Sequence, residues 1–222
     1  MTVPHFAVGD GYAVYRGPVT DSSFHRHAAY QVAIGDEVAM VDGAANRHEG
    51  AALVVAPMVR HRMLANADVL TYFVEPHCVF ADRLRERCGT GISAAPDLRG
   101  LRAEDIGAHP SGTLDPRLVT ALDTLAGRAV PMPGLAAMVG LSPQRLRALA
   151  RQQVGMPLAR WRMWVRLRRA AEALRAGASV AEAAVTAGFA DQAHLTRGMR
   201  DMMGLTPSAV LPVLRGHSRR AT

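Results

Sequence analysis

The sequence contains no lysine, only two cysteines and no long apolar run. Two cysteines cannot build a disulfide framework, which excludes a small disulfide-stabilised secreted fold. Cys78 and Cys88 are instead expected to be small buried residues of one helix. No apolar stretch approaches the roughly 18 residues that a membrane-spanning helix needs, and the first ten residues do not have the pattern of a secretory signal. These absences favour a cytoplasmic protein with no membrane partner.

The amounts of apolar and charged residues are those of a globular protein. The chain has 222 residues, of which 49% are hydrophobic and 20% are charged, and this composition excludes a disordered chain. The length is that of one large domain or two small ones.

The positive charge is concentrated in the second half of the chain. Residues 1–130 contain 12 arginines and 15 acidic residues, whereas residues 131–222 contain 14 arginines and only 4 acidic residues. A GC-rich genome would explain the use of arginine in place of lysine, but it does not explain why acidic residues are scarce in one half. The second half is therefore predicted to be a separate basic unit, and its expected partner is a polyanion, most commonly nucleic acid.

Residues 12–75 have the pattern of short antiparallel strands. The predicted strands are residues 12–15, 30–34, 37–41, 52–56 and 69–74. Gly35-Asp36 and Asp42-Gly43 are predicted to form tight turns between strands. Short strands at roughly ten-residue spacing favour a small barrel or sandwich.

The apolar period becomes helical after Pro76. Two helices are predicted from stripes of apolar residues at helical spacing, one with Phe80, Leu84 and Cys88 and one with Leu114, Leu118, Leu122 and Leu125. Helix-breaking residues place a domain boundary near residues 127–133. The chain is thereby divided into a strand-rich domain (1–113), a connecting helix (114–130) and a helical domain (131–214), so the predicted fold class is α+β.

The helical domain contains a duplicated unit. In the first copy a short apolar helix ends at Gly140, and Ser142 with Pro143 is suited to begin a second helix. The same order recurs with Gly188 as the turn and Asp191 as the cap. A helix, a glycine turn and a capped second helix are the signature of a helix-turn-helix, and two copies in one basic stretch strengthen that prediction.

One long helix, residues 158–176, is predicted between the two copies. Trp161 and Trp164 are expected to be buried in the core, and arginines cover the remaining faces of the helix. Nineteen residues span about 28 Å at 1.5 Å per residue. This length can separate two recognition helices by about one turn of DNA, roughly 34 Å.

Residues 130–212 resemble the AraC/XylS family of bacterial transcription regulators. The matching motifs are Leu135-Ala136, Gly140-Leu-Ser142, Arg166-Leu167 with Ala170-Ala171, Gly188-Phe189-Ala-Asp191, Leu195-Thr-Arg197 and Gly204-Leu-Thr-Pro207-Ser208. Ala150 and Met199 depart from the family, which usually has phenylalanine there, and Ala209-Val210-Leu211 replaces its aromatic-arginine pair. These departures loosen the expected packing but leave the DNA-binding surface in place.

The resemblance implies that exposed residues early in the second helix of each unit contact DNA. The candidate DNA-binding residues are Gln144, Arg145, Arg147, Ala148, Gln192, Ala193, His194, Thr196 and Arg197. Their chemistry agrees with this role, because arginine pairs with guanine, glutamine pairs with adenine, and small side chains contact the thymine methyl group. The alternative is that these side chains are merely solvated.

Three histidines of the first domain are spaced as in the cupin motifs. His25 and His27 precede Gln31, and His61 follows Pro57. Histidines on alternate residues of a strand point the same way, and a third can complete a divalent-metal site. Gln31 stands where cupins usually have glutamate, which disfavours a hard metal ion. Three interpretations stay open for His25, His27, Gln31 and His61: a metal site, an effector pocket without metal, or structural histidines.

AraC-type regulators commonly carry a cupin-like barrel as a sensor domain, and this chain is expected to have the same organisation. The function predicted is a sequence-specific DNA-binding transcription regulator controlled by a small molecule or metal. The alternative is a cupin metalloenzyme with a helical appendage, which explains neither Gln31 nor the duplicated basic unit, so no enzyme activity is expected. The expected partners are double-stranded DNA, a small-molecule effector, RNA polymerase and a second copy of the chain. The leucine stripe of residues 114–125 is expected to pack on the barrel or on its copy in a homodimer.

Overall fold

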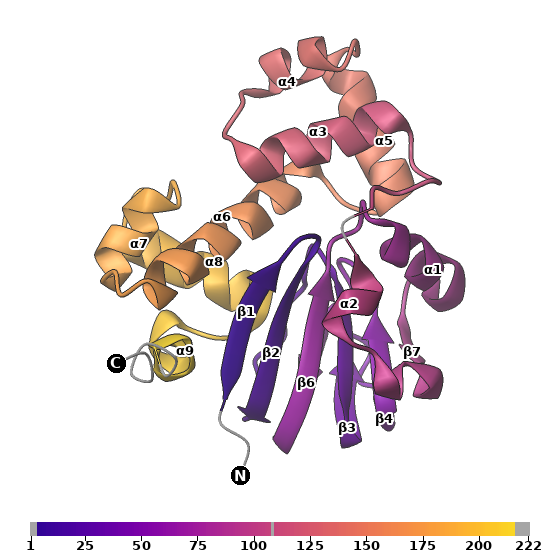
Figure 1. Cartoon of the computed structure of the whole chain (residues 1–222), viewed down its shortest axis with the longest axis vertical. Helices are drawn as coiled ribbons and strands as arrows, with labels where there is room; N and C mark the ends of the chain where they lie inside the picture. Colours follow the sequence, from indigo (N-terminus) through magenta and orange to yellow (C-terminus); the bar gives the residue numbers. More distant parts are fainter. Residues whose placement is uncertain (1–3, 108, 216–222) are drawn as a thin grey trace.

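The computed structural model describes residues 4–107 and 109–215, which form a sheet domain and a helical domain (Figure 1). The strands are β1 His5–Gly9, β2 Tyr12–Val19, β3 Tyr30–Asp42, β4 Arg47–Val55, β5 His61–Met63, β6 Asn66–Val74 and β7 Ile92–Ala94. They pair antiparallel in the order β1-β2-β6-β3-β4-β7, and β5 pairs with β3 beside this path. The predicted α+β class is confirmed.

The sheet is open, so the expected closed barrel is wrong. Strands β1 and β7 form its two ends, and α9 of the helical domain packs against β1. A helix that covers an edge strand protects its unpaired backbone groups, so closure of the sheet is not needed.

The predicted turns had different outcomes. The chain turns between β3 and β4 at Asp42, where the amide of Ala45 donates to the Asp42 carbonyl. The turn expected at Gly35-Asp36 is wrong, because β3 continues through both residues with an irregularity between Ile34 and Val38. A bulge and a tight turn use the same residue types, so local sequence does not distinguish them.

Short helices cover one side of the sheet. These are α1 Val79–Cys88, the 3₁₀ helix η1 Pro96–Gly100 and α2 Ala103–Ile106. Phe80 and Leu84 of α1 share a core with Val32 and Tyr72 of the sheet. Both cysteines are buried and free, as expected, and burial raises the pKa of each thiol.

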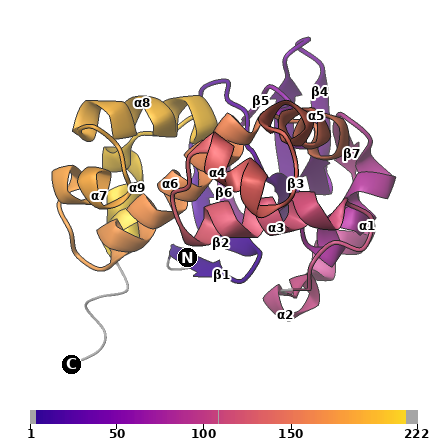
Figure 2. The same cartoon turned by 90° about the horizontal axis from the view of Figure 1, so that it is seen from above.

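The helical domain surrounds one long helix. Its helices are α3 Pro116–Gly127, α4 Met132–Met138, α5 Pro143–Val154, α6 Leu158–Arg175, α7 Val180–Thr186, α8 Gln192–Met203 and α9 Pro207–Arg215. Viewed from above, α7, α8 and α9 lie at one end of α6, and α3 and α5 lie at the other (Figure 2). The long helix and the burial of Trp161 and Trp164 are as predicted.

The leucine stripe of α3 is buried within this chain. Leu118 and Leu122 belong to the same core cluster as Leu146 of α5 and Trp161 of α6, and the indole of Trp161 donates to the Leu122 carbonyl at 3.0 Å. The stripe is therefore buried within the chain, in one core with the first helix-turn-helix unit and α6.

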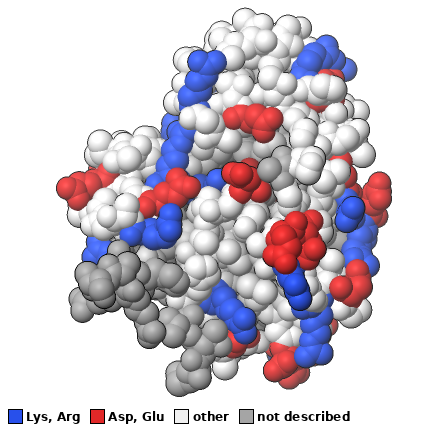
Figure 3. All heavy atoms as spheres, in the orientation of Figure 1, with Lys and Arg blue, Asp and Glu red and all other residues white. Residues whose placement is uncertain are grey.

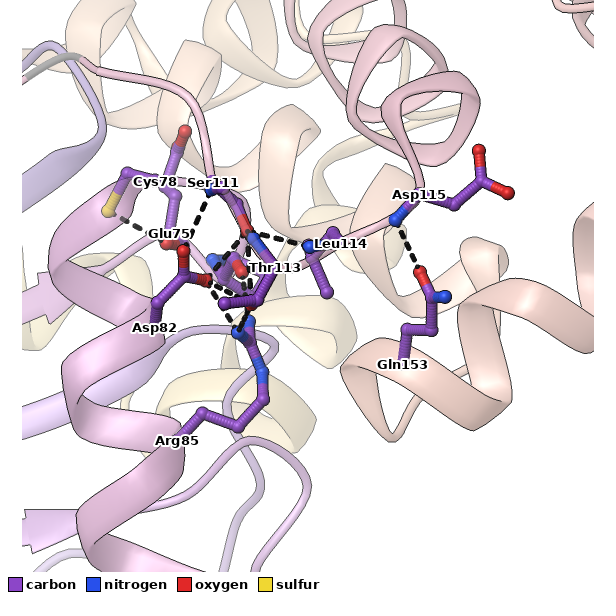
Figure 4. A network of polar contacts seen from close by, with 11 residues as sticks. Glu75, Cys78, Asp82, Arg85, Ser111, Thr113, Leu114, Asp115 and Gln153 are labelled. Carbon is purple, nitrogen blue, oxygen red and sulfur yellow. Dashed lines mark hydrogen bonds and ion pairs between the residues drawn. The ribbon is translucent and has the colours of Figure 1, made fainter.

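The connection between the domains is held by Asp82 of α1 (Figure 4). Its carboxylate accepts hydrogen bonds from the Ser111 hydroxyl at 2.6 Å, the Gly112 amide at 2.9 Å and the Thr113 hydroxyl at 2.9 Å. Arg85 donates to the same carboxylate at 2.6 Å. These contacts fix the segment that leads into α3.

Candidate nucleic-acid interface and interdomain cavity

The first helix-turn-helix unit consists of α4 and α5. Gly140 adopts φ +66 between them, a left-handed conformation that favours glycine. The Ser142 side chain accepts from the Arg145 amide and caps α5. Ala136 of α4 is fully buried, and Leu146 of α5 faces the same core. The exposed face of α5 is thereby fixed in orientation.

The second unit, α7 and α8, repeats this construction. Gly188 adopts φ +82 at the turn, and the Asp191 side chain accepts from the His194 amide at 2.6 Å and caps α8. Ala184 is fully buried, like Ala136 in the first unit. The two small residues allow the two helices of each unit to approach closely.

Most of the predicted DNA-binding side chains are exposed. These are Gln144, Arg145, Arg147 and Ala148 on α5, and Gln192, Ala193 and Arg197 on α8. His194 and Thr196 are only partly exposed. The ring of His194 packs on Phe189 with 5.2 Å between centroids, and the Thr196 hydroxyl donates to the Gln192 carbonyl. These two side chains are therefore less free to contact a base.

Two arginines of α6 join Arg147 in a basic cluster that sequence reasoning did not single out. Burial and the positive charges of Arg166 and Arg147 lower the pKa of Arg162, so the three guanidinium groups act on one another. A Cβ atom at Gly188 would lie 3.7 Å from Arg166 Nε, which places Arg166 beside the turn of the second unit. In Figure 3 basic side chains follow the notch between the upper helices and the left-hand helices. The i, i+4 spacing of Arg162 and Arg166 could have indicated this cluster.

Other arginines of α6 and its surroundings do not face solvent as expected. Arg168 pairs with the buried Glu75 of the sheet domain, and the indole of Trp164 points at the same carboxylate oxygen at 3.4 Å. Arg160 pairs with Asp201 of α8. The guanidinium group of Arg168 is therefore used in a contact between the two domains.

A cavity of about 370 Å³ lies between the sheet domain and the second unit. Most of its lining is apolar, including Phe73 of β6, Leu167 of α6 and Met203 of α8. The polar groups of its wall are few and include Arg168, Thr71, His25, His27 and Gln31. An apolar cavity with a few placed polar groups has the size and character of a small-molecule site.

His25, His27 and His61 converge as the sequence predicted. Their candidate ligand nitrogens all lie within 4.8 Å of one another, and Nε2 of His25 is 3.0 Å from Nε2 of His27. The backbone of His25 pairs with that of His61 by two hydrogen bonds of 2.9 and 3.1 Å. This short bridge, and not the regular strand expected, brings the rings together.

The hydrogen bond of its outer nitrogen fixes the tautomer of His25. Nδ1 of His25 faces the Ser23 carbonyl at 2.7 Å. A carbonyl only accepts, so this Nδ1 carries the hydrogen and Nε2 presents a lone pair to the cluster. His61 has an acceptor at each nitrogen, because Nδ1 faces the Val59 carbonyl at 3.0 Å and Nε2 lies 2.7 Å from Oε1 of Gln31.

Burial keeps the three rings neutral. Burial is the main cause that lowers the pKa of His25, lowers that of His61 to about 3 and lowers that of His27 well below its ordinary value; the neighbouring histidines add to the last two shifts. Neutral imidazoles are the form that binds metal. Three imidazole nitrogens and an amide oxygen fit a borderline ion such as Zn²⁺ better than hard Mg²⁺.

Comparisons with known proteins agree with this architecture. Residues 135–211 match the family described as helix-turn-helix domain, while no curated protein sequence matches the chain. ToxT from Vibrio cholerae O395 has the same fold, with a TM-score of 0.60, 11% identity and coverage of 94% of this chain and 100% of that one.

Two further solved structures are similar. The unsaturated fatty acid-bound ToxT of Vibrio cholerae strain SCE256 has a TM-score of 0.61 and 11% identity, over 95% of this chain and 98% of that one. An AraC-type regulator from Chromobacterium violaceum is 22% identical over 48% of this chain and 96% of that one, with a TM-score of 0.42. The chain thus carries a helix-turn-helix domain at residues 135–211 behind an N-terminal sheet domain, and it shares the two-domain fold of ToxT.

Proposed function

We propose that the protein binds specific DNA sequences through α5 and α8 and that a small molecule in the interdomain cavity controls this binding. The observation that carries the proposal is the pair of capped recognition helices with exposed arginine and glutamine side chains. Arg147 and Gln192 are the main candidates for base contacts. The cluster of Arg147, Arg162 and Arg166 would contact phosphates between the two major grooves.

The location and remaining partners follow from this role. A regulator acts where the chromosome and RNA polymerase are, so we place the protein in the cytoplasm of a bacterium. In the described residues, no helix is long and apolar enough to cross a bilayer. A homodimer also belongs to the proposal, although the leucine stripe of α3 is used inside the chain. Sedimentation of the full chain on DNA with two half-sites tests it.

The effector we propose is an apolar molecule with an acidic head. The cavity is mostly apolar, and Arg168 at its wall is the cation that could accept a carboxylate in competition with Glu75. ToxT bound to an unsaturated fatty acid has the same fold. Ligand in the cavity would touch both domains, so it can bias the position of α8 only if it binds two arrangements with different affinity.

We further propose that His25, His27 and His61 bind a divalent metal ion, with Gln31 as a fourth ligand. The support is the convergence of three buried histidine rings, two of which are oriented by hydrogen-bond contacts at Nδ1. A cupin metalloenzyme would use such an ion for catalysis. We favour a regulatory role, because a glutamine replaces the carboxylate and the same histidines border the second recognition helix.

Selection of bound sequences from random DNA tests the DNA-binding role. The full chain should enrich one motif with two half-sites. Arg147→Ala should relax the preference at one base pair of that motif, whereas Arg83→Ala on α1 of the sheet domain should leave the motif unchanged. Loss of affinity for all sequences alike in Arg147→Ala would show that α5 does not contact bases.

Oleate is a suitable probe for the cavity. It should raise the melting temperature of the wild-type chain and change its DNA affinity. Ala171→Leu, which fills the cavity from α6, should abolish both effects, whereas Ala176→Leu at the exposed end of α6 should retain them. An unchanged response in Ala171→Leu would place the effector elsewhere.

A further inference from the structure

The histidine cluster borders the interdomain cavity. His25 and His27 line the cavity together with Gln31, and His61, which is fully buried, completes the cluster from within the sheet domain. The candidate ligand nitrogens of the three histidines lie within 4.8 Å of one another. A metal ion held between these nitrogens would therefore form part of the cavity wall.

The spacing of the nitrogens suits a shared ion. Nε2 of His25 lies 3.0 Å from Nε2 of His27, and two ligands about 2.0–2.1 Å from a tetrahedral zinc ion are about 3.3 Å apart. The hydrogen bond at Nδ1 of His25 leaves the lone pair of its Nε2 for the cluster. Zinc with three histidine ligands keeps a position for an exchangeable group, which Gln31 or a molecule in the cavity can occupy.

The charge of such an ion is not balanced by the residues around it. A histidine that binds a metal is neutral, and the amide of Gln31 is neutral, so the ion keeps both of its positive charges. In the part of the chain that the structure describes, the cluster includes no carboxylate, and neither aspartate nor glutamate lines the cavity. A buried charge without an opposite partner is unfavourable. A metal-loaded site therefore needs an anion from the cavity.

The other cation of the cavity wall, Arg168, already has its anion. Its guanidinium group pairs with the buried carboxylate of Glu75, and the indole of Trp164 points at the same carboxylate oxygen. An acid that binds Arg168 must compete with this carboxylate, whereas an acid that binds the ion competes only with neutral groups. With a metal bound, the histidine end of the cavity is thus the stronger site for an acidic head.

We propose that a carboxylate of the effector completes the coordination of a divalent ion held by His25, His27 and His61, so that the protein binds the metal and the acid cooperatively. The inference rests on the effector cavity and the metal site proposed above, and it assigns the acidic head to the ion in place of Arg168. The apolar part of the effector would lie against Phe73 and Leu167 in the same cavity. The effector thus supplies the negative charge that a glutamine at position 31 does not.

The metal and the acid together would act on the second recognition helix. Residues 22–27 carry two of the histidines, and the Ser23 hydroxyl in this segment donates to the Gly204 carbonyl at the end of α8, at 3.1 Å. Met199 and Met203 of the same helix line the cavity. Acid or metal alone would occupy only part of this site, so a full response of DNA binding is expected only when both are present.

Cooperative binding has two consequences that can be measured. By reciprocity, the metal must raise the affinity for the acid by the same factor as the acid raises the affinity for the metal. An uncharged molecule with the same apolar chain cannot balance the charge of the ion. Its affinity should therefore not depend on the metal.

Zinc, octanoate and octanamide are the probes for the test. The full chain, prepared without a histidine tag and stripped of metal with EDTA, is titrated with octanoate with and without equimolar Zn²⁺. Zinc should raise the affinity for octanoate by about 5- to 150-fold, the usual size of a coupling between two sites, and octanoate should raise the affinity for zinc equally. Octanamide should bind equally well with and without zinc. With Co²⁺ in place of zinc, octanoate but not octanamide should change the visible absorption of the ion.

A variant that returns a carboxylate to the protein gives the sharpest comparison. Gln31→Glu should bind zinc more tightly than the wild type in the absence of acid, and zinc should no longer raise its affinity for octanoate. Gln152→Glu, at an exposed position of α5, adds the same charge far from the cluster and should behave as the wild type. His61→Gln should lose zinc binding and the coupling, whereas His48→Gln, at a histidine outside the cluster, should retain both.

The possible failures are distinguishable. If zinc does not bind, the proposed metal site and this inference both fail, while the DNA-binding role stands on its own sequence selection. If zinc binds but leaves the affinity for octanoate unchanged, only the cooperative site is overturned. Equal coupling for octanoate and octanamide, or undiminished coupling in Gln31→Glu, would also overturn it, because the carboxylate of the acid would then not be the missing ligand.

Discussion

The two helix-turn-helix units are nearly identical in local design but differ in what holds their far ends. The helices α5 and α8 have 12 residues each, begin at a side-chain cap and end at a left-handed glycine. A Cβ atom at Gly155, the C-terminal cap of α5, would have nothing within 4 Å, whereas Gly204, the cap of α8, lies against residues 22–27, called the histidine loop below. The first unit is thus packed within its own domain, and the second is attached to the sheet domain.

This difference shows how one domain can act on one unit and leave the other unchanged. The sheet domain is connected to the first unit through the segment clamped by Asp82 and through α3. It reaches the second unit directly, through the histidine loop and the cavity. A signal in the cavity or at the histidines is therefore expected to move α8 relative to α5.

The largest effect is expected from breaking the ion pair beside the second unit. Arg168→Met leaves the carboxylate of Glu75, only 3% exposed, without its guanidinium partner. Removal of one partner of a buried pair costs about 3–5 kcal/mol. Urea unfolding of the full chain measures the loss. Arg169→Met is the control, because Arg169 donates to the Ala126 carbonyl at 2.9 Å. Equal losses of unfolding free energy in the two variants would show that the Arg168–Glu75 ion pair stabilises the fold no more than this single hydrogen bond does.

A direct comparison of the two units comes from their terminal glycines. Gly155 has φ +69 and Gly204 has φ +68. Alanine at either position should therefore lower the stability by about 1–2 kcal/mol, the cost of the left-handed backbone for a residue with a side chain. Gly204→Ala should cost a further 1–3 kcal/mol or so, because its Cβ atom would overlap the histidine loop. Chemical denaturation of both variants gives the difference. Equal costs would show that the loop is not held against α8.

The connection to the first unit should depend on pH through Asp82. Burial by itself raises the pKa of Asp82, but hydrogen bonds from Ser111, Arg85 and Thr113 overcome this and lower the pKa below its ordinary 3.8. The stabilisation is therefore present above pH 3.8 and is lost as the pH falls through the lower folded-state pKa.

Asp82→Asn tests this contribution. The variant should be less stable by about 1.5–3 kcal/mol at neutral pH, the value of hydrogen bonds to a charged group, and this difference should shrink toward pH 3. Unfolding curves at several pH values measure it, and Asp10→Asn, at an exposed carboxylate, is the control. A difference that does not change with pH would contradict the assignment.

The two recognition helices should read different base pairs of the selected motif. Arg147→Ala should cost about 1–3 kcal/mol at one base pair of the selected motif, and Gln192→Ala should relax a different base pair in the other half-site. Competition binding with single-base variants of the motif measures both. Loss at the same base pair in the two variants would contradict the assignment of one helix to each half-site.

The sequence predicted the two units well because their determinants are local. Ser142, Asp191 and the turn glycines Gly140 and Gly188 each act on residues within a few positions along the chain. The same holds for α6, whose length follows from its apolar period. Local signals of this kind fix elements and their order without any information on distant contacts.

The features that the sequence did not predict depend on distant contacts. The open sheet depends on α9 covering β1, and the role of Arg168 depends on Glu75, which lies 93 residues earlier. The convergence of the histidines was predicted, and a pocket at these residues was one of the interpretations, but the contribution of the helical domain to the walls of the cavity was not predicted. No pattern within one segment carries that information.

The smallest effects are expected at the N-terminal caps, where the two units should again differ. Ser142→Ala and Asp191→Ala each remove the side-chain acceptor that caps a helix start, which should lower the stability by about 1 kcal/mol. The loss of exchange protection should spread along α5, because a Cβ atom at Gly155, at the other end of that helix, would have nothing within 4 Å. In α8 it should stay within the first turn, because the histidine loop holds the last turn. Amide exchange by residue distinguishes these patterns. If protection falls along the whole of α8 in Asp191→Ala, the loop does not act as a cap, and the two units differ only in their surroundings.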